Sequence, residues 1–513
     1  MKLRHTQLLL VTVSYLFSQA ADQADHYEKD FQALELSDPI TIDGYLHEPA
    51  WAGPGLTDFV QRDPLEGEEP TQRTEVWVAY DQSALYVAAR LYDSAPDSIV
   101  RRLGRRDGDN SADYFAVGVD PWHDHRSGFL FVVNAAGAIT DATLYNDASL
   151  ESSWDGVWES AVTIDDGGWN LEIRVPFSQL RFPEQDDHVW GMGFGRWIER
   201  NQENIYYVLV PKASSGEVSW FAHARGITGI ERPSTLELLP YTSGSAEYLQ
   251  PETGNPFHDG RDYLGQVGLD VKWGITSSLT LDATINPDFG QVEVDPAVIN
   301  LGYFETRYEE KRPFFVEGSN IFRFGAGGTT NNYAFNYGLP SFFYSRRVGR
   351  SPQMDPIRDY DYSSIPNNTT ILGAAKVSGK LNSEWSLGVA DAVTRREIAS
   401  LDSAGQRFKE TVEPLTNYSV IRLQREISEG RHGLGVIGAT TYRDLSTANG
   451  HSSLSQSAIA GGVDGWMTLD PEGVYVMNGF LGYTRLAGGR SMMTDKQDSY
   501  PHYFGRPDAN HLE

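Results

Sequence analysis

The chain has 513 residues, which is long enough for two or more domains, each with its own core. Its net charge of -28 excludes nucleic acid as a partner, because nucleic-acid phosphates require a basic surface. The absence of cysteine excludes disulfides, thiolate metal sites and a cysteine nucleophile, and without a long apolar run any membrane crossing must use strands.

The first twenty residues contain the three parts of a secretory signal peptide. Lys2 and Arg4 form a basic head, residues 8–17 an apolar body, and Ser18-Gln19-Ala20 a small-residue exit. The alternative is a buried N-terminal strand or helix. We predict that residues 1–20 are a signal peptide and that the mature protein is exported.

Short strands fill the first half, residues 35–232. Residues 75–80 and 84–92 alternate apolar and polar side chains on either side of a turn, which predicts a hairpin. Further strands are predicted at 114–119, 129–133, 169–175, 190–194 and 206–210. Apart from one turn after Pro176, helical periodicity is absent from this half. Many short strands without helices predict a two-sheet β-sandwich.

The same half resembles a known family. The segments that carry the resemblance occur in this order: ITIDGYLHEPAW, VWVAYDQSALYVAARLYD, ADYFAVGVDP, GWNLEIRVPFSQLRF and WGMGFGRWIERNQE. They are similar to a family 9-like carbohydrate-binding module (DOMON-like) over residues 36–230. The resemblance implies a saccharide-binding sandwich that accompanies glycoside-degrading enzymes, and it allows for structural calcium.

The chain departs from the sugar site that the resemblance implies. Sugar-binding members hold the ring between two tryptophans, and the first, expected near residues 109–113, is missing here. Trp220 matches the second. Val132 replaces a basic residue of the central strand. The pocket, as usually built, is therefore incomplete.

Five tryptophans are the candidate carbohydrate-binding residues, because an indole can stack on the apolar face of a sugar. They are Trp122, Trp154, Trp158, Trp197 and Trp220. Ser152-Ser153 and Asp155-Gly156 predict a loop around Trp154 and Trp158, which favours these two. The alternative is that each of these tryptophans is simply a large residue of the core or of its rim.

Catalysis is the less favoured interpretation, and no catalytic residue is assigned. Glycoside hydrolysis needs two carboxylates, and Asp113, Asp155, Glu159 and Glu172 are the candidates, although acidic pairs arise readily in so acidic a chain. The spacing of His123 and His125 in a turn is more typical of exposed, unliganded histidines than of a metal site. Metal ligands therefore stay unassigned.

Longer and cleaner alternation begins in the second half, residues 233–513. Strands are predicted at 266–275, 279–285, 371–381, 385–394, 418–426, 433–442, 462–469 and 474–486. About ten residues suffice for a tilted strand that crosses a membrane, so we predict an outer-membrane β-barrel in contact with lipid. Residues 397–414 are predicted to be a long polar loop, and Asp270 and Lys272 to face the lumen. The alternative is an amphipathic sheet whose apolar face packs on the sandwich.

Residues 286–318 connect the two patterns. This stretch, NPDFGQVEVDPAVINLGYFETRYEEKRPFFVEG, together with ILGAAKVSGK and VEPLTNYSVIRLQRE, resembles a largely uncharacterised bacterial outer-membrane β-barrel family. The resemblance implies a family 9-like module joined to a barrel. Residues 309–313 are either a charged segment in the lumen or a periplasmic turn packed against the sandwich. The last strand lacks a C-terminal aromatic ending, so we expect a truncated barrel.

The combined prediction is an all-β protein of the outer membrane that recognises or takes up a saccharide. One alternative is a hydrolase acting on O-glycosyl compounds. The other is a non-catalytic sandwich that serves as a plug or interaction domain on a barrel.

Overall fold

A computed structural model describes most of the chain. The described residues are 29–108, 111–152, 154–213, 216–230, 236–248, 250, 252–276, 278–287, 306–308, 310–325, 341–428, 430–447, 454–470 and 475–497. The predicted signal peptide, much of the connecting stretch 286–318 and the last residues of the chain lie outside them.

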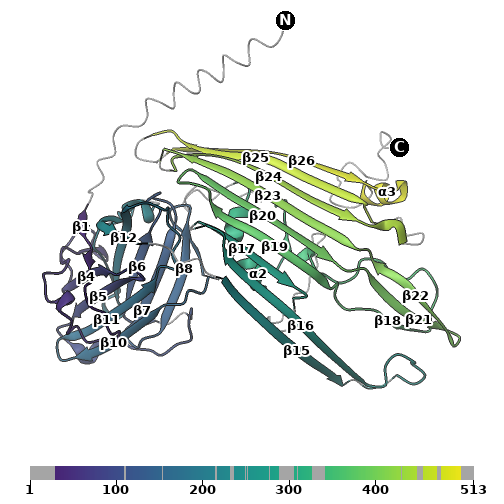
Figure 1. The fold of residues 1–513 in the computed structure, drawn as a ribbon, viewed down its shortest axis with the longest axis horizontal. Helices are drawn as coiled ribbons and strands as arrows, with labels where there is room; N and C mark the ends of the chain where they lie inside the picture. Colours follow the sequence, from purple (N-terminus) through teal and green to yellow (C-terminus); the bar gives the residue numbers. More distant parts are fainter. Residues whose placement is uncertain are drawn as a thin grey trace, which may run out of the picture.

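Two sheets packed face to face form the first half (Figure 1). The larger sheet has the order β1-β14-β12-β6-β7-β8-β9, with β13 pairing both β12 and β3. Its strands are β1 (Asp30–Gln32), β3 (Val60–Asp63), β6 (Tyr114–Asp120), β7 (Gly128–Asn134), β8 (Ile139–Tyr145), β9 (Ser149–Glu151), β12 (Asp187–Ile198), β13 (Glu203–Tyr206) and β14 (Ala222–Thr228).

The smaller sheet has the order β10-β11-β5-β4-β2. Its strands are β2 (Leu34–Glu35), β4 (Thr74–Tyr80), β5 (Ala84–Tyr92), β10 (Glu159–Asp165) and β11 (Gly168–Pro176). Every second residue of the facing strands enters one shared core, as Phe115 and Val117 of β6 and Leu171 and Ile173 of β11 do. The predicted hairpin and the two-sheet sandwich are confirmed. The predicted strand 206–210 is displaced, because β13 ends at Tyr206.

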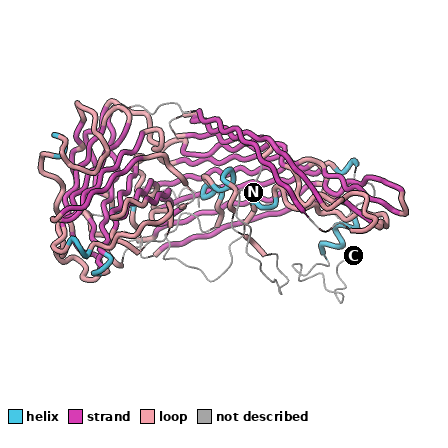
Figure 2. Tube along the Cα trace, turned by 90° about the horizontal axis from the view of Figure 1, so that it is seen from below, coloured by secondary structure: helices cyan, strands magenta, loops and turns pink. Residues whose placement is uncertain are grey.

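A nine-stranded antiparallel sheet dominates the second half, with the order β15-β16-β17-β19-β20-β23-β24-β25-β26. Its strands are β15 (Leu236–Tyr248), β16 (Arg261–Gly274), β17 (Leu279–Ile285), β19 (Ile371–Lys380), β20 (Trp385–Thr394), β23 (Thr416–Ile427), β24 (His432–Arg443), β25 (Ser457–Thr468) and β26 (Val476–Ala487). Figure 2 shows these long strands running away from the sandwich. Among the described residues the sheet is open, with β15 and β26 at its edges, so a closed barrel is not confirmed.

Shorter elements complete the two halves. A three-stranded sheet has the order β18-β21-β22, with β18 (Tyr362–Ser364), β21 (Glu397–Ser403) and β22 (Gln406–Glu413). The long polar loop predicted at 397–414 is therefore wrong, because these residues form a hairpin. The helices are α2 (Pro313–Val316) and α3 (Arg490–Gln497). The 3-10 turns are η1 (Pro49–Trp51), η2 (Pro96–Ser98), η3 (Glu199–Asn201), η4 (Val218–Trp220), η5 (Ser319–Phe322), η6 (Ser345–Arg347) and η7 (Leu445–Thr447). Within the described part of the chain, no helix is long and apolar enough to cross a membrane.

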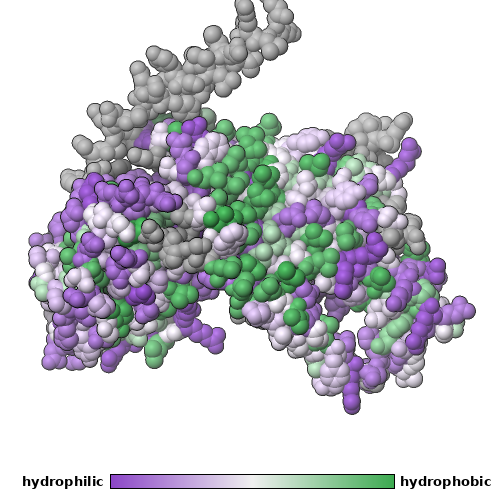
Figure 3. Space-filling view, in the orientation of Figure 1, coloured by the Kyte–Doolittle hydropathy of each residue, from purple (hydrophilic) through white to green (hydrophobic). Residues whose placement is uncertain are grey.

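The nine-stranded sheet has the reverse of the usual polarity of a soluble protein. Apolar side chains stand on its exposed face, where Val267 is 68% and Leu434 is 58% exposed. Figure 3 shows hydrophobic side chains gathered over this sheet, whereas the sandwich is mostly hydrophilic in the same view. The alternative in which the apolar face packs on the sandwich is therefore wrong.

Polar and charged side chains lie on the opposite, covered face of the sheet. Lys376 Nζ lies 3.4 Å from Asp282, and Arg422 donates to Asp464 at 2.5 Å, with both of these pairs buried. Lys272 Nζ lies 2.6 Å from Glu317. Because small side chains such as those of Ala390 and Ala439 share this face, the chain that follows α2 can pack against it.

The charged segment at the end of the connecting stretch also lies against the covered face. Arg312 pairs with Glu310 at 2.6 Å and donates to the carbonyls of Ser345 and Val348 at 2.7 and 2.6 Å. Phe315, which follows in α2, packs against the β19 residues Ile371 and Ala374. The segment that ends in α2 thus contacts the covered face of the sheet, and its placement in a lumen stays a prediction, because a closed barrel is not confirmed.

Candidate functional site

A cavity of about 180 Å³ opens on the outer face of the larger sandwich sheet. We call it the sheet-face cavity. Its walls come from β6, β7, β12 and β13 and from the turn before β14. The lining residues are Tyr114, Ala116, Gly118, Leu130, Val132, Gly193, Phe194, Gly195, Asn204, Tyr206, Val208, Val210, Glu217, Trp220 and Phe221. Its volume lies below the about 300–1,000 Å³ of pockets for drug-sized ligands, so it suits one small ring.

Two glycines create the floor of this cavity. A Cβ at Gly118 would lie 2.3 Å from the ring of Phe221, and a Cβ at Gly193 would lie 2.4 Å from the same ring. These glycines face each other on the paired strands β6 and β12. Only glycine at both positions lets the phenyl ring rest on the sheet. The floor is therefore aromatic and close to the backbone.

Aromatic rings also form the walls. Trp220 is partly exposed at the cavity, with Tyr114 and Tyr206 among the other lining residues. Burial raises the pKa of Tyr114 to about 12, and burial also raises the pKa of Tyr206. Both phenols therefore keep their protons at neutral pH. They can donate hydrogen bonds to a ligand as well as contact its apolar faces.

Glu217 and Asn204 are the polar groups of the lining. Burial raises the pKa of Glu217, while the Arg62 guanidinium opposes this shift and the Asp147 carboxylate adds to it. Asn204 donates from Nδ2 to the Tyr206 hydroxyl at 3.3 Å. A carboxylate and an amide beside aromatic rings can pair with the hydroxyls of a polyol while the rings cover its C–H faces.

The turn that presents Trp220 is fixed by Asp147. Its Oδ1 accepts the backbone N–H groups of Glu217 at 3.0 Å and Ser219 at 2.9 Å, and its Oδ2 accepts the Ser219 hydroxyl at 2.9 Å. Val218 N–H donates to the Asp147 carbonyl at 3.0 Å. Because Asp147 follows β8 and the turn precedes β14, its side chain ties two distant segments together at the cavity.

The five candidate tryptophans separate into three groups. Trp220 lines the sheet-face cavity, and Trp197 lies beside it, stacked on Tyr114 at 6.3 Å between ring centroids. Trp122 lies at a second cavity, described below. Trp154 and Trp158 are only 8% and 7% exposed, and Trp154 lines the second cavity as well.

The loop predicted around Trp154 and Trp158 is confirmed, but both rings fold from it into the sandwich core. Trp154 packs on Phe129 and Phe131, and Trp158 packs on Phe131 and directs its Nε1 to Asp141 at 3.3 Å. The backbone from 154 to 158 is irregular, as predicted, yet its indoles are internal. Neither ring lines the sheet-face cavity, and the preference given to these two tryptophans stays a prediction.

Two of the positions that the family resemblance singles out lie at this cavity. Trp220 and Val132, which match the expected second tryptophan and replace the expected basic residue, both line it. Sequence reasoning missed Tyr114, Tyr206, Glu217 and Asn204. The alternation of β6, which points Tyr114, Ala116 and Gly118 to the same face, was the available signal for the first of these.

The four candidate catalytic carboxylates have structural partners instead. Asp113 accepts the Glu199 N–H at 3.0 Å, and Glu159 pairs with Arg174 at 3.2 Å. The buried Glu172 accepts from the N–H groups of Asp43 and Gly44 and from Trp51 Nε1, at 2.8 to 3.0 Å. None of the four lines the sheet-face cavity, whose described lining includes one carboxylate, Glu217.

The fourth, Asp155, belongs to a carboxylate cluster with Asp107 and Asp141. Arg106 lies among the three, donating to both oxygens of Asp141 at 2.7 and 2.8 Å and lying 3.2 Å from Asp155. Asp141 also accepts the Gly156 N–H at 2.6 Å. Arg106 pairs with all three carboxylates, and the structural calcium that the resemblance allows for stays a prediction.

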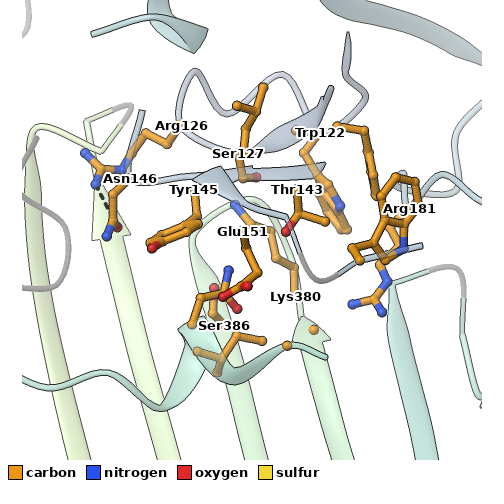
Figure 4. Close-up of a pocket in the computed structure, with 18 of the residues that line it drawn as sticks. Trp122, Arg126, Ser127, Thr143, Tyr145, Asn146, Glu151, Arg181, Lys380 and Ser386 are labelled. Atoms are coloured by element: carbon orange, nitrogen blue, oxygen red, sulfur yellow. Dashed lines mark hydrogen bonds between the residues drawn. The ribbon is translucent and has the colours of Figure 1, made fainter. Parts of the chain in front are cut away.

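A second cavity, also of about 180 Å³, lies between the sandwich and the nine-stranded sheet (Figure 4). We call it the junction cavity. Trp122, Arg126, Tyr145 and Glu151 line it from the sandwich, and Lys380 and Ser386 are among those that line it from the sheet. Its position between the two halves makes it a junction as much as a binding pocket.

Two cationic side chains join the halves beside the junction cavity. Lys380 of β19 pairs with the buried carboxylate of Asp124. Arg126 extends the other way, donates from Nη1 to the Gly430 carbonyl at 2.8 Å and lies over the Trp466 ring at 5.2 Å. A Cβ on Gly430 would lie 1.6 Å from Arg126 Cδ, so glycine is required where the arginine passes.

Comparison with known proteins finds a family match within the second half and similar solved structures for part of the chain. Residues 232–449 match the family described as "Domain of unknown function (DUF5916)". No curated protein matches the chain.

Two solved structures are similar, both of a family 9 carbohydrate-binding module from Caldicellulosiruptor kristjanssonii. The complex with cellotriose is 14% identical over 38% of this chain and 93% of that chain, with a TM-score of 0.29. The complex with glucose is 15% identical over 40% of this chain and 97% of that chain, with a TM-score of 0.29. Each likeness extends to about two fifths of the chain.

Proposed function

We propose that this protein binds a saccharide in the sheet-face cavity of its sandwich and is held in the bacterial outer membrane by its second half. The observation that carries the proposal is the composition of the cavity. Trp220, Tyr114 and Tyr206 surround a space suited to one ring, with Glu217 and Asn204 placed to pair with hydroxyls.

Saccharides suit this lining better than other small molecules do. A sugar ring has C–H faces that pack on aromatic rings and an equatorial rim of hydroxyls that needs both donors and acceptors. The phenols supply donors, Glu217 supplies an acceptor, and the amide of Asn204 supplies both. The missing first tryptophan removes one wall of the two-sided clamp, so a ligand rests on one aromatic side and on the floor formed by Phe221.

The polarity of the nine-stranded sheet supports the membrane part of the proposal. Exposed apolar side chains on one face and buried ion pairs on the other are the arrangement of strands whose outer face contacts lipid. The longest strand, β16, has 14 residues, which exceeds the about 9–11 needed to cross a bilayer at a tilt. We infer that these strands belong to a transmembrane barrel and that saccharide recognition serves uptake through or at that barrel.

Calorimetric titration of the full chain in detergent micelles with a panel of mono- and oligosaccharides tests the binding part. The expected result is saturable binding of one glycan class. Silence across the panel, from protein whose circular dichroism shows folded strands, would favour the plug or interaction role, for which the contacts of Lys380 and Arg126 between the two halves provide the basis. Recovery of the chain in the soluble periplasmic fraction would contradict the membrane assignment.

A further inference from the structure

Three histidines from two distant parts of the sandwich meet in one cluster. His123 and His125 lie in the loop between β6 and β7, and His223 lies in β14. The His123 ring centroid is 4.5 Å from that of His125 and 4.8 Å from that of His223. Three nitrogen atoms, one from each ring, lie within 4.8 Å of one another. The expectation that His123 and His125 are simply exposed is wrong, because both are half-buried against a third imidazole.

The loop is held in the conformation that brings these rings together. Asp120 accepts the N–H of Trp122 at 3.1 Å and that of His125 at 2.9 Å. Asp124 accepts the N–H of Arg126 at 2.8 Å. His123 and His125 both have a positive φ, of 52° and 59°, a region that non-glycine residues occupy uncommonly. Such backbone is strained and persists where surrounding contacts impose it, often at ligand sites.

The cluster also contains a buried ring nitrogen that has no partner. His123 Nε2 is buried and has no hydrogen-bond partner in the described part of the chain. A buried polar atom without a partner costs free energy, and an ion bound there would satisfy it.

A carboxylate stands next to the cluster. Asp30 Oδ1 lies 3.5 Å from His223 Nδ1 and 2.9 Å from Arg225 Nε. Asp30 and His223 are paired residues of the parallel strands β1 and β14. In metal sites, a carboxylate commonly accepts a hydrogen bond from the imidazole nitrogen that does not bind the metal, and this contact orients the ring. Asp30 is placed to do this at Nδ1 of His223, which leaves Nε2 for the metal.

We propose that His123, His125 and His223 together bind a divalent transition-metal ion, with Zn²⁺ the best match. Three imidazoles suit zinc and its neighbours, whereas calcium prefers oxygen ligands. The ion links β14 to the loop that contains Trp122 and Asp124, and Asp124 pairs with Lys380 of the nine-stranded sheet. Its role is structural: it fixes the loop of the sandwich that faces the second half.

Titration of the untagged full chain, stripped of metal with a chelator, with Co²⁺ and Zn²⁺ alone tests the proposal. The expected result is a single equivalent of Co²⁺ with the strong visible absorption of a low-symmetry nitrogen site, displaced by Zn²⁺. His223→Gln and His123→Gln should each abolish this absorption, and Asp30→Asn should weaken binding about 10- to 100-fold. His47→Gln and His258→Gln, at exposed imidazoles far from the cluster in sequence, are the matched controls and should bind like the wild type.

Thermal unfolding provides a second measurement that does not depend on the visible absorption of bound Co²⁺. Zn²⁺ should raise the melting temperature of the wild type and of His47→Gln, because an ion that binds only the folded state stabilises it by mass action. It should not raise that of His223→Gln. The proposal is overturned if wild-type protein shows no saturable Zn²⁺ or Co²⁺ binding, or if His223→Gln binds as tightly as the controls.

Discussion

Removal of the Trp220 indole should weaken saccharide binding more than any other single truncation in the sheet-face cavity. The ring is partly exposed at the cavity, its turn is fixed by Asp147, and its neighbours Phe221 and Tyr206 are also aromatic. Trp220→Ala leaves the β-strands of the sandwich untouched, because the residue lies in the short turn η4. The variant should therefore fold and lose affinity.

The size of the loss follows from the area of one ring face. An indole that offers one face to a ligand buries about one third of the roughly 200 Å² that a large aromatic side chain can bury, which is about 70 Å². At about 25 cal/mol per Å², this contact contributes about 1.7 kcal/mol. The dissociation constant should therefore rise roughly 15- to 20-fold.

Calorimetry with the glycan that the wild type binds best measures this change. Trp77→Ala is the matched control, because Trp77 lies on the opposite sheet, where its Nε1 donates to the Gly53 carbonyl at 2.7 Å. This control should bind like the wild type. A Trp220→Ala protein within about twofold of the wild-type affinity, where a factor of ten is 1.4 kcal/mol, would refute the assignment of the ring as a stacking platform.

Three further changes test the surroundings of the cavity and the junction. Ionised Glu217 is expected to accept ligand hydroxyls, and its pKa is raised, so the affinity should fall on acidification at a higher pH than it would for an exposed glutamate. Glu217→Gln should bind weakly, and its affinity measured by calorimetry should not depend on pH. A variant whose affinity depends on pH as that of the wild type does would contradict this. Asp147→Ala should weaken binding about as much as loss of Trp220 does, whereas Asp147→Asn, which keeps the Oδ1 acceptor, should bind nearly normally; equal losses would contradict a positioning role. Lys380→Met should lower the free energy of unfolding by about 3 kcal/mol in urea titrations, because it leaves the buried Asp124 carboxylate without its cation. Lys409→Met, at an exposed site, is the control, and equal stability of the two would contradict this last expectation.

Period-two alternation predicted most of the strands because one face of each is consistently more apolar than the other. The strand predicted at 279–285 coincides with β17, and those at 371–381 and 385–394 agree with β19 and β20 to within one residue. The hairpin β21–β22 was missed because both of its faces carry charged or polar residues, as in QRFKETVE. Its turn at Ala404-Gly405, with φ of 51° and 79°, was the remaining signal.

The site was harder to predict than the fold. The sequence identified indoles as the ligand-contacting class, yet it could not tell an internal ring such as Trp154 from a partly exposed one such as Trp220. That difference depends on which residues the second sheet places opposite each ring. The cavity also joins Tyr114 to Tyr206 and Glu217, about a hundred residues further along the chain. The pairing of β12 with both β6 and β13 places Tyr206, and the contact with Asp147 places Glu217.

The passage of Arg126 across the junction has a consequence for how the protein is made. The aliphatic part of its side chain occupies the space beside Gly430 that a side chain there would take, and its guanidinium rests on Trp466 of β25. Neither half can therefore reach its final packing alone, since the arginine needs a finished turn between β23 and β24 and that turn has a gap without the arginine. During biogenesis the sandwich and these strands should mature together, and a chain stalled before this contact forms would expose an unfilled notch to quality-control proteases.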